Sequence, residues 1–349
     1  MAKVGILTFH SSPNVGAMLQ AYGLSKAIEC LGHEVKVIDY RPSTVRMATK
    51  FHFWRYRNPI NLIRDTLRRY RVYRFRRTFL SLSQTYMNSE DLMEAPPAVD
   101  YVVVGSDQVW NTTTPLRGYD PIFFLKFLKD RDIHRVSYAA TFGNGFDLGA
   151  NHAEIASLLA QFESISVRDR NSAEMVRTLI DRTAAHVLDP CFLTDYSDIT
   201  PPALSKTDYI LVYCFRRTKA FEHAVETLEK ELQMPVISIK TAFEGARVVH
   251  PDPSQWLSLM RHASYVCTDS FHGTCFALIN KKPFLTFPYR GGESRLQDVL
   301  QTVGLLNRLI TDEKSFKSAM LTPINYKAVA ESINIERQKS LSFLSKALI

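Results

Sequence analysis

The chain alternates between short apolar runs and longer amphipathic stretches. Residues 4–9 form an apolar run, residues 18–31 carry apolar side chains at helical spacing, and residues 34–39 return to a strand-like run. Strand-length runs separated by a helical stretch predict parallel strands joined by a crossover helix. The same alternation recurs over residues 209–240 and 263–287. The pattern therefore predicts an α/β protein with Rossmann-like units.

The polar, proline-containing stretch 195–208 interrupts this alternation, and we interpret it as an interdomain linker. A chain of 349 residues is long for a single core. We therefore expect an N-terminal α/β domain over residues 1–195 and a C-terminal α/β domain over residues 196–322. Residues 323–349 have helical spacing, and we expect this tail to pack back on the first domain.

The net charge of +8 is concentrated in one segment. Residues 46–77 hold eleven Lys and Arg against one acid, a local balance of +10, so the remaining chain carries a net −2. Apolar and basic residues alternate there at helical spacing, which predicts a basic helical insertion over about residues 46–95. Such a helix either packs on its domain with a solvated face or lies on an anionic membrane. A nucleic-acid surface is the third interpretation, which we do not expect because the basicity belongs to one excursion.

Composition narrows the class of protein further. The five cysteines are scattered without a CxxC pair, as is typical of reduced thiols in a cytosolic protein. No signal-peptide pattern and no apolar run of membrane-spanning length are present in the sequence. No closely spaced His/Cys cluster has metal-ligand spacing. We therefore expect a cytoplasmic protein without a metal or cofactor, whose basic segment could contact a membrane surface.

A polar turn after the apolar run 263–267 is the first candidate site. A helical run starts at Thr274, so the turn lies at the carboxyl edge of a predicted strand, where α/β proteins bind ligands. The first amides of a helix carry free N–H groups and partial positive charge, which suits an anion. His272 beside Gly273 can approach such an anion, although a structural histidine explains the pattern equally well. Two further candidates for binding an anion are Arg168, at a helix start, and Arg295, behind a glycine loop.

A second polar cluster follows the buried run 100–105. Asp107, Gln108, Trp110 and Asn111 combine carboxylate, amide and indole groups, which bind sugar hydroxyls and stack on sugar rings. A capped turn with a core tryptophan explains the same residues. The loop after residues 4–9 contains only Gly16, so it is not a dinucleotide-binding fingerprint.

Five stretches together resemble the polysaccharide pyruvyl transferase family. They are NVGAMLQAY at 14–22, VGSDQVWN at 104–111, SVRD at 166–169, LDP at 188–190 and DSFHG at 269–273. The resemblance implies two Rossmann-like domains facing across a cleft, as in GT-B glycosyltransferases. It also implies transfer of a pyruvyl group from phosphoenolpyruvate to two hydroxyls of one sugar. The product is a cyclic ketal in a cell-surface polysaccharide or its lipid-linked precursor, and phosphate is released.

The implied chemistry assigns roles to the candidate residues. We expect His272 to act as general acid/base or phosphate contact, with Asp107 or His10 helping to deprotonate the acceptor. Some family members carry arginine two places before the motif histidine, where this chain has Ser270. The expected donor contacts are Ser270, Gly273 and Thr274, with the cations Arg168, Arg216, Arg217, Lys240 and Arg295, which we do not rank. The expected acceptor contacts are Asn14, Gly16, Gln108, Trp110 and Asn111.

Two other functions stay open from the sequence. A nucleotide-sugar-dependent GT-B glycosyltransferase has the same architecture. A non-catalytic protein that binds polyanions through the basic segment belongs to a different class, and salt-sensitive binding would be its signature.

Overall fold

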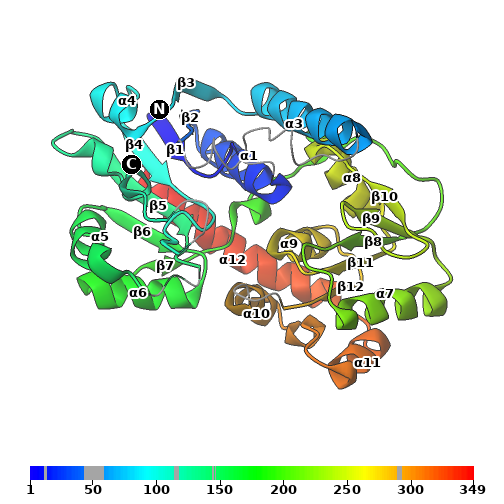
Figure 1. Cartoon of the computed structure of the whole chain (residues 1–349). Coiled ribbons are helices and arrows are strands. Elements are labelled where there is room, and N and C mark those ends of the chain that lie inside the picture. The colour runs from blue at the N-terminus through cyan, green and yellow to red at the C-terminus, as the bar shows by residue number, and fades with distance from the viewer. Residues whose placement is uncertain (12–13, 43–58, 114–117, 144, 146, 289–292) are drawn as a thin grey trace. The chain divides into compact units, whose positions relative to one another are not determined.

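The computed structural model describes residues 1–11, 14–42, 59–113, 118–143, 145, 147–288 and 293–349. The chain folds into two compact units (Figure 1). The first unit comprises residues 1–194 and 336–349, and the second comprises residues 195–335. The tail is one long helix, α12 (Tyr326–Ala347), whose first part belongs to the second unit and whose last part belongs to the first.

The first unit is built on a seven-stranded sheet in which every pair is parallel. The strand order is β3-β2-β1-β4-β5-β6-β7, so the order reverses between β1 and β4. Ligands bind α/β sheets at such a reversal. The strands are β1 (Lys3–Leu7), β2 (Glu34–Tyr40), β3 (Leu82–Tyr86), β4 (Tyr101–Val104), β5 (His134–Ala140), β6 (Ser164–Val167) and β7 (Ala185–His186).

Among the described residues, five α-helices of the first unit connect these strands. They are α1 (Val15–Cys30), α3 (Pro59–Phe79), α4 (Ser89–Glu94), α5 (His152–Leu159) and α6 (Arg170–Ile180). Helices α5 and α6 lie together beside the β6–β7 end of the sheet (Figure 1). The tail is tied to this unit because Ser340 Oγ accepts from Leu188 N at 3.0 Å and Tyr101 Oη donates to Ile349 O at 2.5 Å.

The described part of the basic insertion contains α3, β3 and α4, whereas residues 46–58 lie outside the described residues. Strand β3 was not predicted. Its sequence LSQTY is half polar, and it extends the sheet edge by pairing with β2, Asp39 standing opposite Thr85. An edge strand needs only one apolar face, so it leaves a weak signal in the sequence.

The second unit has a five-stranded parallel sheet of order β10-β9-β8-β11-β12. Its strands are β8 (Ile210–Tyr213), β9 (Val236–Ile239), β10 (Arg247–Val249), β11 (Tyr265–Thr268) and β12 (Phe284–Thr286). The helices that accompany them are α7 (Lys219–Leu232), α8 (Pro253–His262), α9 (Phe271–Ile279), α10 (Glu293–Thr302) and α11 (Glu313–Leu321).

Polar side chains fix where these helices begin. Helix α8 starts with a capping box, in which Asp252 accepts from Gln255 N while the Gln255 side chain accepts from Asp252 N, and Pro253 fills the first turn. Ser270 caps α9 with a single side-chain bond, accepting from Gly273 N. The candidate turn therefore lies where the sequence pattern placed it, between β11 and α9.

No helix among the described residues combines the length and the apolar character that crossing a lipid bilayer requires.

Candidate functional site

The carboxyl edge of the second sheet gathers most of the predicted donor-binding groups. Arg216 and Arg217 follow β8, Lys240 follows β9, and His272 follows β11. Because these strands are neighbours and parallel, their carboxyl ends meet at one edge. Arg295 on α10 reaches the same edge, its guanidinium carbon lying 6.0 Å from the centroid of the Phe271 ring. Four of the five predicted cations are thus brought together in one unit.

Asp269 organises this edge, a role that the sequence reasoning missed. One carboxylate oxygen accepts from Phe215 N and the other from Arg216 N, both at 2.8 Å. Only 4% of Asp269 is exposed, and burial raises the pKa of its carboxyl although the two amide bonds oppose the shift. The carboxylate therefore fixes the loop after β8 against the turn after β11. An acid directly after a buried strand was the available signal.

The turn residues predicted to touch the donor are largely structural. Thr274 is fully buried, and its hydroxyl donates to Ser270 O at 3.1 Å and lies 2.9 Å from Thr286 Oγ1. Its assignment as a donor contact is wrong because the hydroxyl joins α9 to β12. Gly273 lies against β11, where a β-carbon would come within 2.3 Å of Thr268 Oγ1. The glycine therefore permits α9 to pack closely on the sheet. This packing explains the glycine, in place of the predicted close approach of a ligand.

His272 lies in the first turn of α9, one residue after Phe271, with which it makes an edge-to-face ring contact at 5.3 Å. The residue is 7% exposed. The positive end of the helix surrounds it, which suits an anion at this place. Its role as acid, base or phosphate contact stays a prediction.

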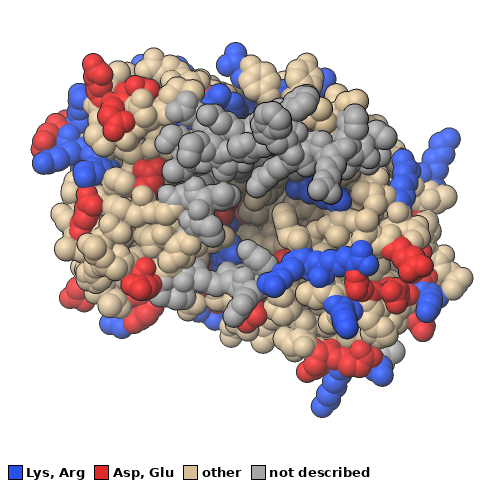
Figure 2. Space-filling model, viewed as in Figure 1, with Lys and Arg blue, Asp and Glu red and all other residues tan. Residues whose placement is uncertain are grey.

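The cations at this edge differ in how they are held. Arg217 forms an ion pair with Glu222, donates to Ala242 O at 2.9 Å and stacks over the Phe243 ring. Lys240 Nζ lies 5.5 Å from the centroid of the Phe215 ring, and Arg295 is 7% exposed. Arg216 is anchored through its backbone amide, and its side chain is exposed. Figure 2 shows both acidic and basic side chains over α7 and α11. The glycine loop 291–292 lies outside the described residues.

Arg168 belongs to a buried network of the first unit and not to a donor site. Its Nη1 lies 2.6 Å from Asp189 Oδ2 and its Nη2 lies 3.5 Å from Asp107 Oδ1. Burial alone would lower the pKa of this guanidinium, but the two carboxylates raise the pKa above its ordinary value. The prediction that Arg168 binds the donor is therefore wrong, because aspartates of its own unit neutralise it. Asp107 stands in this network and also accepts from Gln108 N at 2.9 Å, so its role as a base stays a prediction.

His10 is not the predicted base. The residue is 1% exposed, and both ring nitrogens face acceptors, with Nδ1 3.0 Å from Thr8 O and Nε2 2.9 Å from Asp39 Oδ1. Neither nitrogen can therefore take a proton from a sugar hydroxyl. The histidine instead joins the end of β1 to the end of β2.

Trp110 was predicted to stack on a sugar, and the structure contradicts this. The indole is fully buried in the aromatic core of the first unit, packed against Phe124, Phe142 and Phe162, and its Nε1 donates to Phe123 O at 3.0 Å. The alternative, a core tryptophan behind a turn, is confirmed. The apolar neighbours that decide this come from later in the chain than the tryptophan.

The other predicted acceptor contacts lie at turns of the first unit. Asn111 Nδ2 donates to Gln108 Oε1 at 2.8 Å, and this pair packs against Gly143, where a β-carbon would lie 2.4 Å from Gln108 Oε1. Asn14 caps α1 by accepting from Gly16 N at 3.1 Å. Their contacts with an acceptor stay predictions.

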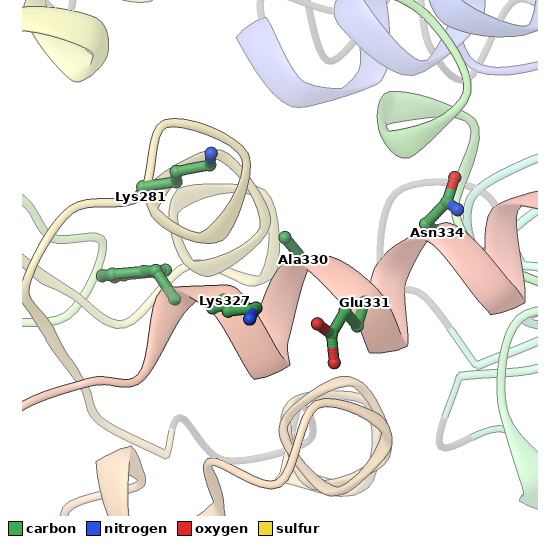
Figure 3. Close-up of a pocket in the computed structure, with 6 residues that line it drawn as sticks. Lys281, Lys327, Ala330, Glu331 and Asn334 are labelled. Atoms are coloured by element: carbon green, nitrogen blue, oxygen red, sulfur yellow. The ribbon is translucent and has the colours of Figure 1, made fainter.

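An open pocket of about 510 Å³ lies elsewhere in the second unit, between the end of α9 and the start of α12 (Figure 3). Its lining residues are Lys281, Tyr326, Lys327, Ala330, Glu331 and Asn334. Lys281 follows the carboxyl end of α9, whereas His272 stands at the amino end of that helix. The pocket therefore does not belong to the candidate site.

Comparison with known proteins places the chain in a family. The sequence model of the family described as polysaccharide pyruvyl transferase matches residues 14–291, while no curated protein matches the chain. Among solved structures, UDP-GlcNAc 2-epimerase from Neisseria meningitidis has a TM-score of 0.53 at 10% identity and covers 100% of this chain and 99% of that chain. UDP-N-acetylglucosamine 2-epimerase from Rickettsia bellii has a TM-score of 0.51 at 13% identity and covers 99% of this chain and 96% of that chain. These likenesses show the fold alone and confirm the predicted GT-B-like α/β architecture. The match over residues 14–291 shows that the chain belongs to the polysaccharide pyruvyl transferase family.

Proposed function

We propose that this transferase moves a pyruvyl group from phosphoenolpyruvate to two hydroxyls of one sugar, releasing phosphate. The acceptor sugar belongs to a cell-surface polysaccharide or its lipid-linked precursor. The family match over residues 14–291 carries the proposal, because it includes His272 and three of the cations that lie at the same edge, Arg216, Arg217 and Lys240. No metal or cofactor takes part in this scheme.

The charges at that edge suit the donor. Phosphoenolpyruvate carries a carboxylate and a phosphate. Its binding site needs several cations or helix amino ends to replace the hydration shell of these two anionic groups. Arg216, Lys240 and Arg295 supply three positive charges, and α9 adds its amino end. Arg216 is the strongest candidate for replacing the arginine absent at Ser270. Its backbone is bonded to Asp269, the residue directly before Ser270.

The reaction balances with the groups present. Protonation of the vinyl methylene makes the neighbouring carbon electrophilic, and the first sugar hydroxyl adds to it while losing its proton. The bond from that carbon to the phosphate oxygen then breaks. The second hydroxyl then closes the ketal ring. The departing phosphate takes up the proton of this hydroxyl. His272 supplies and recovers protons in this scheme, since imidazole exchanges them near neutral pH.

Direct binding tests the proposal without knowledge of the acceptor. Titration calorimetry should show that phosphoenolpyruvate binds the wild type, and Arg216→Met should weaken binding by about 10- to 100-fold, the effect of one charge-assisted contact. Arg217→Met is the matched control, because Glu222 already neutralises that arginine. His272→Gln should retain phosphoenolpyruvate binding, because the scheme gives the imidazole a role in proton transfer, and it should lose phosphate release when an acceptor sugar is supplied. A thermal midpoint raised by UDP-GlcNAc but not by phosphoenolpyruvate would instead support a nucleotide-sugar glycosyltransferase.

The outer face of α3 supports a further part of the proposal, contact with an anionic membrane that holds the acceptor. Four apolar side chains at helical spacing are exposed there: Ile63 by 58%, Leu67 by 47%, Tyr70 by 58% and Tyr73 by 50%. Exposed basic side chains, including Arg74 and Arg77, stand on the same helix. A helix lying on a membrane combines apolar anchors with cations in this way.

A further inference from the structure

Arg76 is a buried arginine to which the proposed reaction gives no role. It lies on the inner side of α3, between the buried Phe75 and the exposed Arg77, and is only 5% exposed. Among the described residues, its guanidinium has no hydrogen bond and no ion pair, and the buried Nε has no acceptor. Its one ring contact is with Tyr73, at 6.0 Å. A buried charge without a partner destabilises a protein, so its presence indicates a ligand.

Asp39 does not neutralise Arg76, because its own hydrogen bonds are already made. Asp39 lies at the end of β2. Its Oδ1 accepts hydrogen bonds from His10 Nε2 at 2.9 Å and from Arg41 Nε at 2.8 Å. Its Oδ2 accepts hydrogen bonds from Arg41 Nη2 at 2.5 Å and from Thr85 Oγ1 at 2.8 Å. A carboxylate has about four acceptor positions, and these four donors fill them. Within the described part of the chain, Asp39 compensates the charge of Arg41, and the charge of Arg76 has no ion pair.

The end of α3 is held beside β2, because Leu80 N donates to Arg76 O at 3.1 Å and Val37 N donates to Ser81 O at 2.7 Å. Burial lowers the pKa of Arg76, and the neighbouring Arg41 lowers it further, while Asp39 opposes the shift. Arg41 is only partly buried, with 27% of its side chain exposed. An arginine fork matches the oxygens of a phosphate. Among the described residues, Arg76 has its whole guanidinium available, whereas Arg41 is bound to Asp39 through Nε and Nη2 and adds only its Nη1.

We propose that Arg76 and Arg41 form a phosphate-binding site at the carboxyl end of β2. Its ligand is the phosphate or diphosphate group of the acceptor, and this identification rests on the proposed function. The site itself does not depend on that function. The adjoining apolar side chains of α3, from Tyr73 back to Ile63, are exposed and favour a phosphate that carries an apolar chain.

Calorimetry with inorganic pyrophosphate tests the site on the full chain. Arg76→Met should weaken pyrophosphate binding by about 10- to 100-fold relative to the wild type, because a charge-assisted fork is lost. Arg77→Met, next to it but exposed, should change the affinity by less than about threefold. Farnesyl diphosphate and UDP-glucose distinguish a lipid diphosphate from a nucleotide diphosphate. If farnesyl diphosphate binds more tightly and its binding depends on Arg76, the acceptor is lipid-linked. If the binding of acetate depends on Arg76 and the binding of pyrophosphate does not, the assignment of a phosphate ligand is overturned.

Stability provides an independent readout. Without ligand, Arg76→Met should raise the unfolding midpoint by about 2 °C or more, because an unpaired buried charge is removed. A variant that is less stable or fails to fold would show that the cation supports the free protein, and would overturn the proposal. Phosphoenolpyruvate binding should be equal in wild type and Arg76→Met. If phosphoenolpyruvate does not bind, the proposed function fails, but Arg76-dependent binding of pyrophosphate can still be observed. The two proposals can therefore fail separately.

Discussion

Substitution of Gly273 by alanine separates the two roles that this glycine could have. The new methyl carbon would lie 2.3 Å from Thr268 Oγ1 and 3.1 Å from its Cβ and Cγ2. Ordinary carbon contacts are about 3.5–4.0 Å, so α9 and β11 would have to separate by about 1 Å. Thr268 cannot turn away easily, because its hydroxyl donates to Tyr213 O at 2.7 Å and accepts from Ser270 N at 3.0 Å.

The size of the effect follows from these contacts. Overpacking destabilises a core by about 1–3 kcal/mol, and displacing the Ser270 cap adds about 0.5–2 kcal/mol. Alanine is the better helix former by about 0.8–1 kcal/mol, which offsets part of this loss. We therefore expect Gly273→Ala to lower the free energy of unfolding by about 1–3 kcal/mol.

Urea unfolding followed by circular dichroism measures this loss, and hydrogen exchange over residues 265–280 locates it. A double-mutant cycle provides the control. In a Thr268→Ala background the hydroxyl and methyl are gone, so the alanine at position 273 should be less destabilising than in the wild type. Equal losses in both backgrounds would refute the packing argument. An alanine variant of wild-type stability that cannot turn over substrate would show that the glycine serves the ligand instead.

Three further predictions test the remaining assignments. Trp110→Ala should lower the free energy of unfolding by about 3–5 kcal/mol, since the indole fills a core, and a loss below 1 kcal/mol by urea unfolding would favour surface stacking. The pKa of the Asp269 carboxyl is raised in the folded protein, so folding favours its protonated form. Its contribution to the free energy of unfolding is therefore full below the pKa of the unfolded state and is lost as the pH rises through the pKa of the folded state. The unfolding midpoint of Asp269→Asn minus that of wild type should therefore grow from pH 3.5 upward, and a constant or falling difference would contradict this. Ile63→Ser with Tyr70→Ser should reduce sedimentation with phosphatidylserine vesicles, whereas equal pelleting would exclude contact through α3.

The sequence alone determined the α/β alternation and the place of the candidate turn, although it did not reveal the edge strand β3. Apolar run length identifies buried strands, and parallel connectivity puts their carboxyl ends at one edge, so Arg216, Lys240 and His272 could be grouped before any coordinates. The five short motifs likewise identified the family.

Tertiary structure decided which polar groups face a ligand and which face each other. Arg168 meets Asp189, and Trp110 meets Phe162, across separations that no local pattern encodes. In the sequence, Arg76 is one of many basic residues on a helix. Only the packing of α3 shows that it is buried and has no hydrogen-bond partner among the residues that the structure describes. Burial and pairing depend on neighbours contributed by distant segments, whereas periodicity reports only which face of its own element a residue occupies.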